Sequence, residues 1–276
     1  MNNPFKYSLD NKRYHTFNYD LKTRFQSKVA KVSLDAFFTC PNRDGTLSHS
    51  GCIFCSARGS GDYTFQDQDL LTQYHKNLEV MRRKWPNCLT IPYFQAFTNT
   101  YGPLSKIQSM LAPFIQREEV CAIAIATRPD CLEQEKIDYL ASLTSQKEIW
   151  IELGLQSSND ETAKWINRGH DFQCLKDCLE KLSKTPIKVC IHIINGLPCE
   201  QIEDMLQTIK DIQDLPFHGL KIHMLHIIKN TPLANMFADE KIIDPLTKEE
   251  YIDLVIRQLE LLPKHIVIQR ITGDPV

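Results

Sequence analysis

Apolar stretches and amphipathic segments alternate along most of the chain. The stretches with strand character are either apolar throughout or alternate apolar with polar positions. They cover residues 29–34, 90–97, 120–126, 148–155, 187–194, 219–227 and 266–271. Segments with apolar positions three and four residues apart predict helices at residues 67–85, 104–117, 133–143, 159–167, 172–183, 201–212 and 248–262.

This order of elements predicts an α/β fold. Strands that are separated by helices, without hairpin signals, are expected to be parallel and joined by right-handed crossovers. We therefore expect a partial (β/α)6 barrel of the TIM type at residues 29–230. Residues 1–28 would form an N-terminal extension, and residues 231–276 a C-terminal extension with one helix and one strand. Residues 1–27 are polar and aromatic without a clean period, which predicts a segment draped over the barrel.

Polar residues and glycines gather where the predicted strands end. They occupy residues 40–55, 98–102, 127–130, 156–158 and 195–198. Because barrels of parallel strands place their chemistry at the carboxyl ends of the strands, we expect the functional site at that end.

The first of these loops holds three cysteines, Cys40, Cys52 and Cys55, spaced Cys-x11-Cys-x2-Cys. A tight turn can aim the last two sulfurs at one metal centre, and the glycines and proline of the loop let Cys40 fold back toward them. Three hypotheses follow. The thiolates could hold a [4Fe–4S] cluster with one open iron, they could hold a closed zinc site with His49 as fourth ligand, or they could be ordinary cysteines. The spacing alone does not choose between the first two.

Composition narrows the class of protein. A chain of 276 residues that is 42% hydrophobic can bury a large core. It carries no signal peptide and no long apolar run, so we expect a soluble cytoplasmic protein without a membrane partner. Ten cysteines in that compartment indicate metal binding or buried thiols, not disulfides. The net charge is −2, yet residues 1–31 hold seven basic and two acidic side chains. That excess, and a second basic cluster at residues 82–84, is either a solvated face or a contact to a polyanion.

Several motifs resemble one known family. Phe54 stands just before the last cysteine, and Asp-Ala-Phe-Phe-Thr precedes Cys-Pro-Asn-Arg-Asp-Gly at residues 35–45. Further motifs lie at residues 13–19, 93–101 and 152–157. Together they resemble the radical SAM superfamily over nearly the whole chain, and within it the YhcC/YtqA-like (MnmL-type) branch related to the Elongator catalytic subunit. The superfamily's usual cysteine spacing is C-x3-C-x2-C; the eleven residues here are typical of that branch.

The resemblance implies a partial barrel of the radical SAM type and two cofactors. Cys40, Cys52 and Cys55 would bind a [4Fe–4S] cluster, whose open iron would bind S-adenosyl-L-methionine (SAM). Reduction of the cluster would cleave SAM and give a 5′-deoxyadenosyl radical that takes hydrogen from carbon. The resemblance also implies a further C-terminal segment after the residues that match 271–274.

The resemblance also assigns cofactor-binding residues. Phe54 would lie near the adenine, and the turn from Gln95 to Asn99 would hold the methionyl ammonium through its backbone. The other assigned residues are Gln156 and Arg168, which would contact SAM, Glu152, which would reach the ribose or the ammonium, and His192, where relatives often carry an acid for the ribose. Gln95 could instead be a capped loop residue, and Arg168 could form an ordinary surface ion pair.

The family resemblance further implies a tRNA substrate with a modified wobble uridine. On that basis we expect conversion of 5-carboxymethylaminomethyluridine to 5-aminomethyluridine, with flavodoxin or ferredoxin as the one-electron donor. The alternatives are a radical SAM enzyme acting on a small molecule or cofactor precursor, and a non-catalytic, zinc-stabilised RNA-binding protein. His223 and His226 are candidates for substrate contact, although buried histidines satisfied by hydrogen bonds are the more ordinary interpretation. Cys174 and Cys178 are interpreted as core thiols.

Overall fold

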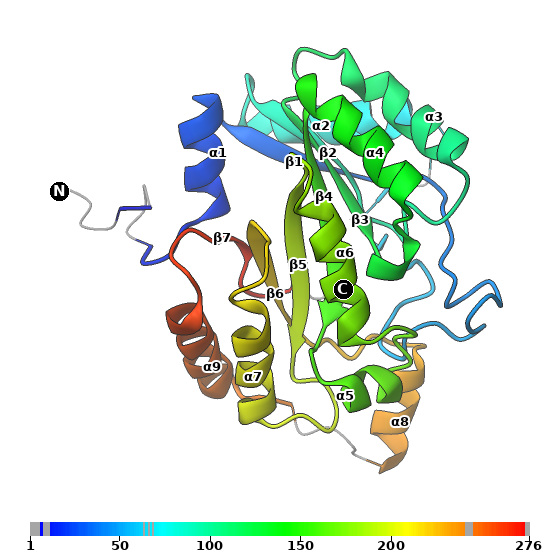
Figure 1. Ribbon diagram of the computed structural model, residues 1–276, viewed down its shortest axis with the longest axis vertical. Helices are drawn as coiled ribbons and strands as arrows, with labels where there is room; N and C mark the ends of the chain where they lie inside the picture. Colours follow the sequence, from blue (N-terminus) through cyan, green and yellow to red (C-terminus); the bar gives the residue numbers. More distant parts are fainter. Residues whose placement is uncertain are drawn as a thin grey trace.

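The computed structural model describes residues 6–7, 12–62, 64–65, 67, 69–240 and 245–273. In this part of the chain, seven parallel strands form one sheet in the order in which they occur in the sequence. The strands are β1 (Val29–Leu34), β2 (Leu89–Phe94), β3 (Ala122–Thr127), β4 (Glu148–Gln156), β5 (Lys188–Asn195), β6 (Gly219–Met224) and β7 (Val267–Arg270). The sheet curls into a partial barrel of the TIM type, as the sequence predicted (Figure 1).

Helices connect successive strands. They are α2 (Leu70–Lys84), α3 (Leu104–Ile115), α4 (Gln134–Ser142), α5 (Asp160–Trp165), α6 (Phe172–Leu182), α7 (Ile202–Ile212), α8 (Pro232–Glu240) and α9 (Lys248–Leu261), with short 3-10 helices η1 (Pro129–Cys131) and η2 (Leu143–Ser145). Most of them cover the outer face of the sheet, while α8 lies beyond the strands at the bottom of the view (Figure 1). The helix starts follow from the sequence. The side chains of Asp69 and Asp171 cap α2 and α6, and Thr247 with Glu250 forms a capping box at α9.

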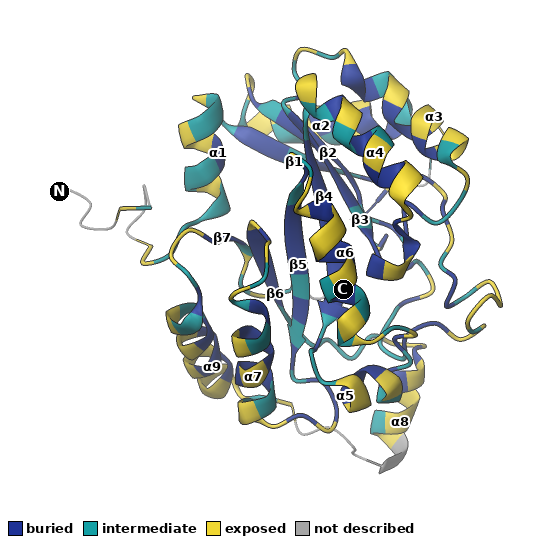
Figure 2. Cartoon of the chain, viewed as in Figure 1, coloured by how far each residue is buried: buried dark blue, intermediate teal, exposed yellow. Residues whose placement is uncertain are grey.

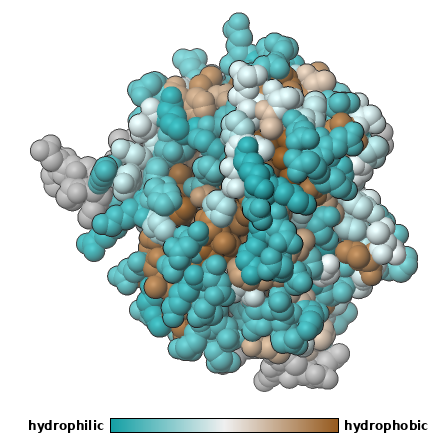
Figure 3. Space-filling model, in the orientation of Figure 1, coloured by the Kyte–Doolittle hydropathy of each residue, from teal (hydrophilic) through white to brown (hydrophobic). Residues whose placement is uncertain are grey.

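The strand interiors explain why the chain folds this way. β3 is almost entirely buried, and its outward residues Ile123 and Ile125 belong to the large core between sheet and helices. Figure 2 shows the strands as mostly buried, while the helices keep exposed residues on their outer sides. In the same view, hydrophilic side chains cover most of the surface and leave apolar ones in small groups (Figure 3). Burial of apolar side chains on both faces of the sheet is the main stabilising term.

The N-terminal segment differs from the prediction. Residues 17–25 do not drape irregularly; they form helix α1 (Phe17–Phe25), capped by the Thr16 side chain. The helix could not be predicted from the sequence, because Leu21 is its one buried residue and apolar positions therefore do not recur with a helical period. α1 contacts β1 and β7, and the Phe17 ring meets Trp150 edge-on at 6.0 Å. Leu21 of the helix therefore packs into the barrel interior near the amino-terminal ends of the strands. The apolar cluster there also contains Val29, Ile91, Tyr93, Ala122, Ala124, Trp150 and Cys190.

The other differences concern the ends of elements. β2 stops at Phe94, three residues before the predicted end, because the chain turns there. α8 was not predicted; it starts at Pro232, and the fully buried side chain of Leu233 anchors it. β7 pairs in parallel with β6 and so continues the sheet. No helix among the described residues is both long enough and apolar enough to cross a bilayer.

Candidate functional site

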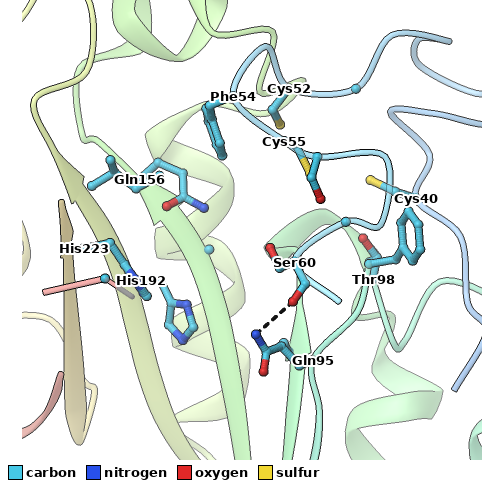
Figure 4. A pocket seen from close by; sticks show the side chains of 18 of the residues that line it. Cys40, Cys52, Phe54, Cys55, Ser60, Gln95, Thr98, Gln156, His192 and His223 are labelled. Atoms are coloured by element: carbon cyan, nitrogen blue, oxygen red, sulfur yellow. Dashed lines mark hydrogen bonds between the residues drawn. The ribbon is translucent and has the colours of Figure 1, made fainter. Parts of the chain in front are cut away.

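A cavity of about 440 Å³ opens at the carboxyl ends of the strands. Its volume lies within the range of sites that bind small molecules. One side is formed by the loop after β1, with Cys40, Cys52 and Cys55. The other side is formed by the ends of β5 and β6, with His192 and His223 (Figure 4). This is the end of the barrel at which the sequence predicted the site.

Backbone hydrogen bonds shape the cysteine loop. The Cys40 carbonyl accepts from the backbone N–H groups of Arg43 (2.8 Å) and Asp44 (3.1 Å), which closes a turn directly after the first cysteine. The Cys55 N–H donates to the Cys52 carbonyl at 3.0 Å, so the last two cysteines share a second turn. The Arg43 guanidinium donates to the Cys55 carbonyl at 2.8 Å and ties the two halves of the loop together.

The surroundings of the cysteine sulfurs suit thiolates. Asn42 Nδ2 lies 3.6 Å and Arg168 Nη1 3.7 Å from Cys52 Sγ, and both are hydrogen-bond donors. Burial raises the pKa of the Cys55 thiol to about 11, and the neighbouring Cys52 adds to this rise. A cationic centre bound at Cys55 would favour its thiolate and offset this cost of burial.

This donor set fits an iron–sulfur cluster better than a single zinc ion. Three soft thiolates at one end of a cavity, with N–H donors near a sulfur, are what a cluster requires. His49, the fourth ligand of the zinc hypothesis, is exposed and does not line the cavity.

The structure brings most of the predicted cofactor residues to the same cavity. Phe54, Gln95, Gln156, Arg168, Glu152 and His192 all line it together with the three cysteines. Figure 4 shows the Phe54 ring and the Gln156 amide at the cavity between the cysteine side and the histidine side. Gln95 donates to the Ser60 carbonyl at 2.9 Å and accepts from Ser33 at 3.1 Å, so it also ties β2 to β1 and the cysteine loop.

Arg168 is buried and is not a surface ion-pair residue. Its Nη2 donates to the Gly154 carbonyl, while its Nε is buried without a hydrogen-bond partner among the described residues. A Cβ at Gly154 would lie 2.8 Å from Arg168 Nη2 and from Gln156 Nε2, so these side chains would have to shift. A buried guanidinium with an unused donor on a cavity wall is suited to bind a carboxylate.

Asn99 is the one predicted residue that the structure does not bring to the cavity lining. It is fully buried, and its Nδ2 donates to the carbonyls of Phe94 and Ala96 at 3.0 Å and of Ala126 at 3.1 Å. The side chain thus holds the turn after β2 in place. Thr98, its neighbour in that turn, does line the cavity.

Glu152 lies at the centre of a buried ionic network on the cavity floor. Its carboxylate accepts hydrogen bonds from Lys31 and Lys221 and pairs with His192 Nε2 at 2.9 Å. Burial alone would raise the pKa of Glu152, but Lys221 and Lys31 outweigh it and hold that pKa well below its usual range. Lys221 also donates to the Tyr93 hydroxyl at 3.2 Å. Both carboxylate oxygens therefore already have partners within the protein.

Lys31, Lys221 and Tyr93 were not predicted from the sequence. A signal was present, because Lys31 stands at an alternating position of the first predicted strand and Lys221 shares the strand face of His223. A lysine at an inward position of a barrel strand indicates a buried charge that needs a partner. The identity of that partner depends on which strands meet inside the barrel.

Two residues of the N-terminal basic excess, Arg24 and Lys28, lie at the opposite end of the barrel from the cavity. Arg24 forms ion pairs with Asp20, on its own helix, and with Glu148, the first residue of β4. Lys28 just precedes β1, and its amine lies 4.5 Å from the centre of the Trp85 ring. These contacts explain part of the basic excess as structural pairing on the amino-terminal side of the sheet.

The buried histidines make stability depend on pH. Burial lowers the pKa of His192 to about 4 and that of His223 well below its ordinary value. Below the unfolded pKa near 6.5, the unfolded chain binds protons at these positions that the folded chain does not bind. We therefore expect stability to fall between pH 6.5 and pH 5, with a slope that approaches about 1.4 kcal/mol per pH unit for His192 and with His223 acting in the same direction. Acidic groups with lowered pKa bind protons only at lower pH, whereas burial raises the pKa of Glu200 to about 7, so protonation of this carboxyl offsets part of the fall.

Thermal melts between pH 7 and pH 5 test this expectation. The His192→Gln variant should show a shallower fall in melting temperature than the parent protein. The matched control is His75→Gln on the exposed side of α2, which should leave the slope unchanged. Equal slopes for the parent and His192→Gln would contradict the assignment of a neutral buried imidazole.

Comparison with known proteins supports a family assignment. Residues 40–212 match the Radical SAM superfamily, and residues 217–276 match the Radical_SAM C-terminal domain. The chain is 47% identical over 274 residues to the uncharacterized protein YtqA of Bacillus subtilis, covering 99% of this chain and 85% of the relative. It is 32% identical over 266 residues to Protein YhcC of Escherichia coli, covering 95% and 84%.

More distant relatives match over part of the chain. A tRNA uridine(34) acetyltransferase of Methanocaldococcus infernus is 28% identical over 156 residues, which is 55% of this chain and 28% of the relative. Among solved structures, the archaeal Elp3 of Methanocaldococcus infernus superposes with a TM-score of 0.65 at 21% identity. That match covers 90% of this chain and 57% of the other. Coproporphyrinogen III oxidase (HemN) of Escherichia coli superposes with a TM-score of 0.55 at 16% identity, covering 85% and 52%.

Proposed function

The chain belongs to the radical SAM superfamily, and from that premise we propose that it modifies tRNA at the wobble uridine. In the proposed reaction, 5-carboxymethylaminomethyluridine becomes 5-aminomethyluridine. Relatives named tRNA uridine(34) acetyltransferase support a tRNA substrate. The observation that carries the proposal is the convergence of three cysteines and six predicted cofactor-binding residues on one cavity that also has a second, histidine-lined side.

The chain is a radical SAM enzyme, and enzymes of this superfamily use a [4Fe–4S] cluster and SAM. The hypothesis of a non-catalytic, zinc-stabilised RNA-binding protein is therefore wrong. Cys40, Cys52 and Cys55 would hold the cluster, and Arg168 would hold the methionyl carboxylate of SAM. When bound, these cofactors supply a 5′-deoxyadenosyl radical that can take hydrogen from carbon. Flavodoxin or ferredoxin as electron donor and a cytoplasmic location remain predictions.

The protein's own contribution is positioning. Phe54 offers an apolar ring against which an adenine can lie, and Gln156 offers an amide beside it. The buried floor of Tyr93 and Glu152 separates the cavity from solvent on the far side of the barrel. A substrate held against the opposite wall would have its reacting carbon fixed near the cofactor without any acid or base taking part.

The proposed substrate has one carbon that favours hydrogen loss. The methylene of its carboxymethylamino group lies between nitrogen and carboxylate, which stabilise a carbon radical from both sides. After loss of the hydrogen atom, loss of one proton and of one electron to a one-electron acceptor gives an imine. Water then adds to the imine carbon and the carbon–nitrogen bond breaks, giving the free aminomethyl group and glyoxylate.

An isotope experiment tests this function. The reconstituted enzyme is given SAM, reductant and tRNA deuterated at the carboxymethyl carbon. We expect deuterium in 5′-deoxyadenosine, and glyoxylate formed in step with 5-aminomethyluridine, by mass spectrometry. Deuterium arriving only from the methylene attached to the uracil would refute the route, as would glycolate or formate in place of glyoxylate. An unchanged tRNA would refute the function and leave the small-molecule substrate as the alternative.

A further inference from the structure

The cavity side away from the cysteines carries unsatisfied polar atoms. His192 and His223 stand on the neighbouring strands β5 and β6 with ring centres 5.2 Å apart, and His226 follows on the same wall. The Nε2 atoms of His223 and His226 are buried and have no hydrogen-bond partner among the described residues. Burying such an atom without a partner costs about 1–3 kcal/mol, so two on one wall indicate a missing ligand.

The floor beside this wall carries an excess of positive charge. Lys31 and Lys221 both pair with Glu152, which leaves two cations for one carboxylate. Burial lowers the pKa of Lys221 to about 8, against the pull of Glu152. His192 and His223 are neutral at pH 7, because their pKa values are lowered, and so do not change this balance. Neither lysine lines the cavity itself, but Glu152 and Tyr93, which they contact, do, so the excess positive charge acts on the cavity from behind its floor.

We propose that this wall and floor bind the carboxylate of the substrate, the carboxylate attached to the carbon that loses hydrogen. The inference rests on the proposed function and adds the subsite that selects the substrate. The unpartnered histidine Nε2 atoms can donate to carboxylate oxygens as imidazole N–H groups, and the lysines behind Glu152 supply the opposite charge. Binding the carboxylate there fixes the adjacent methylene, which is the position that must be controlled.

The chemistry also sets what the site rejects. A substrate that carries a methyl group in place of the carboxymethyl group would leave both histidine Nε2 atoms unsatisfied and the floor charge uncompensated. Sites built to hydrogen-bond a substrate group discriminate strongly against analogues that lack the group. The carboxylate of SAM is assigned to the other side of the cavity, where Arg168 has an unused Nε.

The first test uses the parent enzyme with SAM bound and two anticodon stem-loops. One carries 5-carboxymethylaminomethyluridine at the wobble position and the other 5-methylaminomethyluridine. We expect the acid to bind at least about tenfold more tightly, measured by anaerobic equilibrium binding. Equal affinities, or no binding of either, overturn the carboxylate site. If the enzyme prefers the acid stem-loop but does not convert it, the carboxylate site stands and the proposed reaction is refuted. If the enzyme converts the acid stem-loop but binds both with equal affinity, the reaction stands and the carboxylate site is refuted.

Variants identify the residues. Lys31→Met removes one positive charge from the floor while Glu152 keeps Lys221 and His192, and His223→Leu removes one wall donor. Each should weaken binding of the acid stem-loop about tenfold and leave the methylaminomethyl stem-loop unchanged, while Lys31→Arg and His223→Gln should restore most of the difference. The matched control is Lys188→Met, a lysine paired with Glu148 at the other end of β5, which should have no effect.

Two results would overturn the assignment. One is an acid preference that survives in both Lys31→Met and His223→Leu. The other is a weakened SAM affinity in these variants with stem-loop discrimination unchanged, because the wall would then serve the carboxylate of the cofactor. Thermal melts test whether each variant is folded. The comparison of the two stem-loops on the parent protein does not depend on any variant, so it tests the carboxylate site even if a variant fails to fold.

Discussion

Replacing Cys40, Cys52 or Cys55 with alanine is expected to abolish both the iron–sulfur absorbance and the cleavage of SAM. The three thiols lie on one side of a single cavity, and a cluster held by three protein ligands cannot lose one and keep its open iron in place. The loss should be complete for each variant alone, because the ligands act as a unit. Anaerobic reconstitution, followed by absorbance and by assay of 5′-deoxyadenosine, measures both effects.

Two controls make this experiment decisive. Cys174→Ala, on the half-buried side of α6, should keep full absorbance and cleavage, because this thiol does not line the cavity. His49→Ala should also keep both, whereas the zinc hypothesis requires it to lose the metal. Full SAM cleavage in Cys40→Ala would refute the proposed ligand set.

Glu152→Ala is expected to lower the free energy of unfolding by about 3–5 kcal/mol at pH 7. Glu152 is the carboxylate partner of both Lys31 and Lys221, and its removal leaves two cations inside the barrel without a counter-ion. For a chain of this length, such a loss corresponds to a drop in melting temperature of about 10 °C. Calorimetry or circular dichroism on the protein without cofactors measures the drop.

The pH dependence of this loss in stability shows how much of it comes from the unpaired lysine charges and how much from the lost packing of the Glu152 side chain. Lys221 has a lowered pKa of about 8, so raising the pH to 9 lets it become neutral and removes much of the penalty in Glu152→Ala. Glu161→Ala is the matched control, because its ion pair with Lys164 is exposed and contributes little. A loss below about 1 kcal/mol for Glu152→Ala at pH 7 would show that the network does not depend on the carboxylate.

The sequence alone was sufficient for the order of strands and helices and for the end of the barrel that carries the site. Apolar runs such as residues 120–126 and the amphipathic period of residues 201–212 express burial against immediate neighbours, so they can be read locally. The cysteine spacing likewise singled out Cys40, Cys52 and Cys55, because the turn that groups two of them is formed within a few residues. Polar residues at successive strand ends then had to meet, since parallel strands end on the same side.

The tertiary structure alone decided how the interior of the barrel is filled. Glu152 was predicted to reach a cofactor and does line the cavity, and only the structure shows that its oxygens also bind lysines from β1 and β6, strands far apart in the sequence. Asn99 turned out to hold its own turn, and α1 formed with a single buried residue because the barrel offered a surface for it. Such contacts depend on strand register and on the curvature of the sheet. Neither the register nor the curvature can be predicted from the order of residues along one strand, because both arise only when all the strands pack together.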